Sequence, residues 1–194
     1  MRVTSGEGME RAAGWSPDGT RFAFSQVING TQSLAVVKPT GNASPGILKS
    51  KISNWLPDWS PDSKWLTYAD ENASWHLLSV DGKEDREIGK LDSWSLTFSR
   101  DGRSLYGIRV IGNDASLIAY DLATSKTRIV KQLDKSLIPA ANLGPGIRFT
   151  LTPDGKSISY SVQKNATSQI WMMQGFKAPS SGWGGWRWPW GTGG

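Results

Sequence analysis

Four aspartates recur in the same local setting and are the first candidates for chemistry. Asp18, Asp62, Asp101 and Asp154 each stand in a segment of the form Trp-Ser-Pro-Asp-Gly or a close variant. Two carboxylates held in one place suffice for glycoside hydrolysis. A catalytic pair is expected once in a chain, however, whereas a residue that returns in every repeat is typical of a turn. We therefore expect these aspartates to bond the backbone of turns.

The other side chains offer little for catalysis. The 194 residues include no cysteine and one histidine, His76, which excludes thiolate metal sites, multi-histidine sites and a cysteine nucleophile. The sequence lacks the Gly-x-Ser-x-Gly elbow of serine hydrolases, and it lacks a phosphate-binding P-loop. His76 lies within a predicted strand, where a structural role is expected. We predict that the chain is no enzyme and binds no cofactor or metal.

Composition and charge limit the classes of partner that this chain is expected to bind. Lys and Arg number 22 against 17 Asp and Glu, a net charge of +5, which is too small to predict nucleic-acid binding. No apolar run approaches the length of a membrane-spanning helix, and residues 1–8 contain no secretory signal. We expect a protein or a small ligand as partner, and the sequence predicts no oligomeric state.

The recurring segment defines a repeat. Its aspartates lie 44, 39 and 53 residues apart, which brackets the period of about 40–45 residues of four-stranded propeller blades. Proline sets φ for a type I turn, and glycine relieves strain after the aspartate. Ser63 replaces the glycine in the second copy, and Arg100 replaces the proline in the third. The copies are Trp15–Gly19, Trp59–Ser63, Phe98–Gly102 and Leu151–Gly155.

Strands are predicted on both sides of each turn, because apolar residues alternate there with period two. The large apolar residue that opens each segment is assigned to the core, and this column is Trp15, Trp59, Phe98 and Leu151. The column six residues after each aspartate holds Phe24, Tyr68, Gly107 and Tyr160. A third strand is predicted to open at Ser33, Ser74, Ser116 and Ser168. The predicted fold class is all-β, a β-propeller of about four four-stranded antiparallel blades.

The predicted blades divide the chain. Propeller repeats are expected over residues 1–177, with blades at 11–50, 54–90, 93–132 and 146–174 and with residues 1–6 as an outer strand. Residues 178–194 carry four of the eleven tryptophans among glycines and prolines. That composition predicts a flexible tail.

The Trp-Ser-Pro-Asp-Gly turns and the strands after them resemble the repeats of TolB-like propellers, relatives of WD repeats. The resemblance covers residues 2 to 176 and implies a bacterial, periplasmic or extracytoplasmic binding scaffold. Members of this group usually have more than four blades, so either this chain is part of a larger propeller or four blades close a ring. One alternative is the propeller accessory domain of a prolyl-oligopeptidase-type serine peptidase without its hydrolase domain. Another is a carbohydrate-binding propeller with tryptophan platforms.

One column suggests a partner surface. Trp55, Trp94 and Arg11 each precede the turn aspartate by seven residues, a register near the start of the innermost strand and one mouth of the central channel. Exposed aromatic and arginine side chains dominate many interfaces. The competing interpretation is that these residues pack beneath loops between the blades. Joint replacement of Trp55 and Trp94 by alanine is predicted to abolish partner binding without loss of stability.

Overall fold

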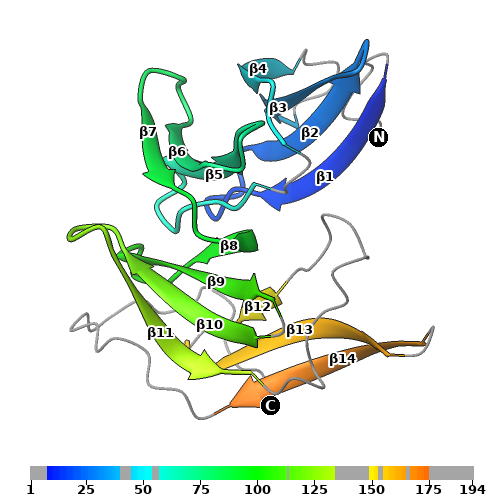
Figure 1. The fold of residues 1–194 in the computed structure, drawn as a ribbon. Helices are drawn as coiled ribbons and strands as arrows, with labels where there is room; N and C mark the ends of the chain where they lie inside the picture. Colours follow the sequence, from blue (N-terminus) through cyan, green and yellow to red (C-terminus); the bar gives the residue numbers. More distant parts are fainter. Residues whose placement is uncertain are drawn as a thin grey trace, which may run out of the picture.

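The structure is a computed structural model that describes residues 8–39, 45–53, 57–112, 114–133, 149–152, 155–164 and 167–174. Within these ranges all regular structure is β-strand, arranged as four antiparallel sheets that follow one another along the chain. Figure 1 shows the sheets along an arc, with the first and the last sheet at its two ends. The predicted all-β propeller class is confirmed.

The strands of each sheet pair in chain order. The first sheet contains β1 (Met9–Trp15), β2 (Phe22–Ile28), β3 (Thr31–Val37) and β4 (Gly46–Ser50), and the second contains β5 (Trp65–Ala69), β6 (Trp75–Ser79) and β7 (Asp85–Gly89). The third contains β8 (Ser93–Phe98), β9 (Ser104–Ile111), β10 (Asp114–Asp121) and β11 (Lys126–Gln132), and the fourth contains β12 (Phe149–Leu151), β13 (Ser157–Lys164) and β14 (Thr167–Gln174).

The blade bounds given above stay a prediction, and parts of them lie outside the described residues. The segment 1–6, the tail 178–194 and residues 54–56, which include Trp55, are among these. An isolated bridge between Trp59 and Leu66 places the segment before β5 beside that strand.

The hydrophobic core lies between neighbouring sheets. Alternate residues of each strand point to opposite faces, so the second and third sheets each contribute one face to the junction before them and one to the junction after them. The clusters are Ala23 and Leu34 with Trp59, Leu66 and Tyr68 at the first junction, Trp75 and Leu77 with Phe98 and Leu105 at the second, and Tyr106 and Leu117 with Phe149 and Ile158 at the third.

The core assignment of Trp15 is wrong. Trp15 is 54% exposed, whereas Trp59 is 6% and Phe98 8% exposed. The residue of this column packs on the sheet that precedes its own, as Trp59 packs on Ala23 and Leu34 of the first sheet. Trp15 belongs to the first sheet, and within the described ranges no sheet precedes it.

In the first and third sheets the serines do not open the third strand, whereas β6 begins at Trp75, directly after Ser74. β3 begins at Thr31, two residues before Ser33, and β10 begins at Asp114. In the fourth sheet the register also differs, because Met173 pairs with Ile158 as Val37 pairs with Phe22. Gln169 rather than Ser168 therefore occupies the position of Ser33. Tight hairpin turns extend strand pairing beyond the serines.

Three of the four turn aspartates, Asp18, Asp62 and Asp101, bond the backbone as predicted, and Asp154 lies outside the described residues. Asp18 Oδ1 accepts hydrogen bonds from Ser16 Oγ (2.5 Å), Thr20 N (2.9 Å) and Thr20 Oγ1 (2.8 Å). Asp62 and Asp101 repeat the bond from the serine two positions earlier. The hydrogen bonds from Ser16 and Thr20 lower the pKa of Asp18 to about 2, because they favour the ionised carboxylate.

We expect Asp18→Asn to destabilise the protein at neutral pH by an amount that shrinks as the pH falls. The folded-state pKa of Asp18, about 2, lies below the ordinary 3.8. Its contribution is therefore complete only above about pH 5, where the carboxyl of the unfolded chain is ionised, and it is lost as the pH falls from there toward 2. Urea midpoints of both proteins along a pH series measure this difference. A difference that stays constant down to pH 2 would contradict the assignment.

Candidate functional site

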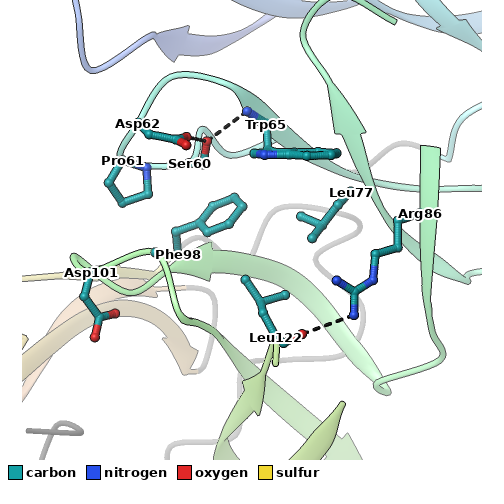
Figure 2. A pocket seen from close by; sticks show the side chains of 10 residues that line it. Ser60, Pro61, Asp62, Trp65, Leu77, Arg86, Phe98, Asp101 and Leu122 are labelled. Atoms are coloured by element: carbon teal, nitrogen blue, oxygen red, sulfur yellow. Dashed lines mark hydrogen bonds between the residues drawn. The ribbon is translucent and has the colours of Figure 1, made fainter. Parts of the chain in front are cut away.

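A cavity of about 320 Å³ lies between the second and third sheets. Its apolar lining comes from Trp65, Leu77, Phe98 and Leu122. Figure 2 shows these four side chains around one space, with Arg86 on one side and with Asp62 and Asp101 on the other. The cavity is within the size range of sites for small ligands or single peptide side chains.

The turns of the first junction are joined by bonds that the second junction lacks the side chains to form. There, Asp18 N donates to Ser63 Oγ (3.0 Å) and Arg21 Nη2 donates to Ser63 O (3.3 Å). The Arg21 guanidinium also lies 5.9 Å from the centre of the Trp59 ring. These contacts tie the two turns together.

Two substitutions remove that tie at the second junction. Gly102 stands where Ser63 stands in the first junction, and Trp65 stands in the place of Arg21. Glycine has no hydroxyl to accept a bond from the preceding turn, and the Trp65 indole replaces the guanidinium that bonds the Ser63 carbonyl oxygen in the first junction. Gly102 (φ 70°) and Ser63 (φ 60°) share the same left-handed backbone, so the side chains differ and the turn does not.

The charged groups around the cavity are oriented by local bonds. Asp62 Oδ1 accepts from Ser60 Oγ (2.5 Å) and Lys64 N (3.1 Å), so the carboxylate is fixed within its turn. Arg86 Nη2 donates to Leu122 O (3.1 Å), which holds β7 to the turn after β10. A ligand in this site would meet an apolar surface between a cationic side and an acidic side. Such an arrangement supports binding.

A second polar cluster joins the first two sheets. Asp85 Oδ2 accepts from Lys49 Nζ (2.6 Å) and from the Tyr68 hydroxyl (2.8 Å), and Asp85 Oδ1 lies 3.1 Å from His76 Nδ1. Burial would raise the pKa of Asp85, but hydrogen bonds from Lys49 and Tyr68 outweigh it and lower that pKa. Burial, followed by the hydrogen bond to Asp85, raises the pKa of Tyr68.

His76 sits inside this cluster. Its ring stacks on Tyr68 with centroids 4.8 Å apart, and its Nε2 lies 3.8 Å from Asp70 Oδ2. Tyr68 is fully buried, so the phenol is closed to a substrate. The positions of these groups favour the structural role expected of His76.

The predicted partner surface is only partly described. Arg11 is exposed on β1, where its guanidinium lies 3.8 Å from Met9 Sδ. Trp94, on β8, is partly buried and packs against the cluster between the third and fourth sheets. Trp55 lies outside the described residues. A surface that joins all three stays a prediction.

Sequence reasoning missed the cavity and one bridging carboxylate. Asp58 Oδ2 accepts from Thr97 Oγ1 (2.7 Å) and Phe98 N (2.9 Å), which fastens the second sheet to the third. Asp58 has no carboxylate counterpart in the other repeats, where Gly14, Thr97 and Thr150 hold its place. One signal in the sequence could have revealed the cavity. The two repeat positions held by Arg21 and Ser63 at the first junction are held by Trp65 and Gly102 at the second.

Among the described residues, no three His, Cys, Asp or Glu side chains are grouped so that they could hold a metal ion. Within those ranges, too, no helix has the length and hydropathy needed to cross a bilayer.

Comparisons with known proteins identify the fold. No family model matches the sequence, and no curated protein matches it. TolB from Acinetobacter baumannii aligns with 89% of this chain at a TM-score of 0.68 and 15% identity, over 42% of its own length. A putative TolB from Agrobacterium tumefaciens aligns with 89% of this chain at a TM-score of 0.68 and 17% identity, over 64% of its own length. An oligogalacturonate lyase from Vibrio parahaemolyticus aligns with 78% of this chain at a TM-score of 0.59 and 14% identity, over 45% of its own length.

These structures establish a TolB-like β-propeller fold, and the predicted resemblance is confirmed at that level. The chain spans 42% and 64% of the two TolB chains. Because the same fold also occurs in a lyase, function has to be argued from the site.

Proposed function

We propose that this chain is a non-enzymatic propeller scaffold that binds a protein segment or a small ligand in the cavity between its second and third sheets. The observation that carries the proposal is the apolar cavity at the second junction, where Gly102 and Trp65 replace the Ser63 and Arg21 that bond the turns of the first junction. The resemblance to TolB-like propellers adds an extracytoplasmic, bacterial setting to the proposal.

The structure around the cavity suits rigid display of a binding surface. Asp58 fastens the two sheets on one side of the space, and Arg86 fastens β7 to the turn at Leu122. A site whose walls are fixed before binding loses little conformational entropy when the ligand arrives. Trp65 and Phe98 offer the aromatic area that dominates many binding sites.

The described residues favour this proposal over a reaction centre. Asp18, Asp62 and Asp101 bond their own turns, and the one histidine stacks on Tyr68 and is not among the residues that line the cavity. An accessory propeller of a serine peptidase would also need a binding surface, so that alternative shares the site and differs in the rest of the protein.

We expect Gly102→Ser to weaken ligand binding at least about tenfold and to cost a little stability, because the left-handed backbone at Gly102 (φ 70°) strains any side chain. Serine occupies the same backbone conformation at Ser63, and a Cβ at Gly102 would meet Pro61 Cδ at 3.6 Å, an ordinary contact. The new hydroxyl should accept a bond from Asp62 N, as Ser63 Oγ does from Asp18 N. That bond would join the two turns that line one part of the cavity.

Ligands for this test come from a displayed random-peptide library and a fragment library selected on the wild-type protein. Their dissociation constants are then measured on Gly102→Ser and on the control Gly19→Ser. Gly19 holds the same turn position (φ 71°), and a Cβ there meets open space. Equal affinity for all three proteins would refute the cavity as the site. Turnover of a selected ligand would refute the non-enzymatic role.

A further inference from the structure

The first sheet carries an exposed aromatic pair, which we call the Trp15–Phe22 corner. Trp15, at the end of β1, is 54% exposed. Its ring meets Phe22 of β2 edge to face, with centroids 5.6 Å apart at 73°. Phe22 is partly buried and packs on a small cluster of Phe24, Ala35 and Val37 on the same sheet. The corner is thus the exposed margin of an apolar face.

In the second and third sheets the equivalent pair is covered by the sheet before it. Trp59 and Leu66 are 6% and 0% exposed, and Phe98 and Leu105 are 8% and 0% exposed. In the fourth sheet Ile158 is fully buried, and Leu151 packs against the same cluster. The Trp15–Phe22 corner therefore has the residues of a sheet–sheet junction.

The junctions also show what such a corner contacts. Trp59 Nε1 donates to the carbonyl oxygen of Gly14 (3.0 Å), the residue directly before the motif in the preceding sheet. Asp58, at that position in the second sheet, bonds Phe98 N of the third. In the last sheet the position is held by Thr150, which is exposed. Thr150 is therefore the residue that a following sheet would contact.

We propose that the Trp15–Phe22 corner is a docking surface for the last sheet of a second copy of this chain, with Trp15 of one copy seated against Thr150 of the other. Continuity with the internal junctions supports this occupant. The last sheet packs one face on the third sheet through Phe149 and Ile158. Its other face corresponds to the face that each earlier sheet presents to the sheet after it. Head-to-tail contacts of this kind close into rings when the rotation permits.

Sedimentation equilibrium of the whole chain tests the proposal. We expect a mass above that of one chain, rising with concentration. Trp15→Lys should weaken the self-association at least about tenfold, as loss of a buried aromatic anchor does. The control Ile129→Lys changes another exposed apolar residue, 47% exposed on β11, and should leave association unchanged. Circular dichroism checks that each variant is folded, and Trp15→Gln serves if Trp15→Lys is not.

A mixing experiment identifies the two surfaces. Thr150→Arg should also dissociate the protein, since it changes the opposite side of the same contact. A mixture of Trp15→Lys and Thr150→Arg should recover a two-copy species, because each variant retains the surface that the other has lost. Any of three results would overturn the proposal: the wild-type protein has the mass of one copy, Ile129→Lys dissociates the protein, or the mixture keeps the mass of one copy. None of these results depends on ligand binding at Gly102.

Discussion

Trp59→Ala is expected to lower the free energy of unfolding by about 3–5 kcal/mol. The Trp59 side chain is 6% exposed and fills the junction between the first two sheets, against Leu34, Leu66 and Tyr68. Its removal leaves a cavity that rigid sheets cannot fill, and it removes the donor that bonds Gly14 O. Urea denaturation followed by circular dichroism measures the change.

Trp15→Ala is the matched control, because Trp15 occupies the same position of the repeat and is 54% exposed. We expect it to cost less than about 1 kcal/mol, as surface substitutions do. The comparison is made at dilutions where the chain is a single copy. If Trp59→Ala left the urea midpoint unchanged, Trp59 could not be the residue that fills the first junction.

Gly107→Tyr is expected to destabilise the protein by about 3 kcal/mol, although it restores the aromatic residue of this column. A Cβ at Gly107 would lie 2.6 Å from Ser93 Oγ and 2.9 Å from Leu96 Cδ2. Both contacts come from β8, where the register shifts between Ser93 and Leu96. The bulged strand occupies the space that an aromatic ring would need. Thermal unfolding of the variant measures the loss.

Ile111→Tyr controls for adding a ring to the same strand. Ile111 is 57% exposed at the end of β9, so the larger side chain meets solvent and should change the midpoint little. A Gly107→Tyr protein as stable as the wild type would mean that β8 can move away, and the close approach at Gly107 would not constrain the fold.

The strands and turns could be predicted because they depend on local chemistry. Period-two alternation and the Ser-Pro-Asp-Gly turn require only neighbouring residues, and the bonds of Asp18, Asp62 and Asp101 confirm them. Burial could not be predicted column by column. Trp15 and Trp59 are the same residue in the same motif, yet their exposure depends on whether another sheet lies alongside.

The cavity was beyond prediction for a related reason. It depends on Trp65 in one repeat and Gly102 in the next, which meet only after the sheets have packed. Each substitution on its own looks like tolerated variation within a repeat, as the serine at Ser63 does. Gly107 belongs to the same class, because the bulge in β8 that excludes a side chain there has no sequence signature of its own.

The position that follows each turn aspartate has a consequence for how such a protein could diversify. Ser63 and Gly102 share one backbone conformation. The Ser63 hydroxyl bonds the turn of the preceding sheet, whereas glycine has no hydroxyl with which to do so. Exchange of this residue together with the Arg21 or Trp65 position of the preceding repeat could therefore create or remove a ligand cavity. A protein built from such repeats can acquire new binding specificities at one sheet–sheet junction at a time.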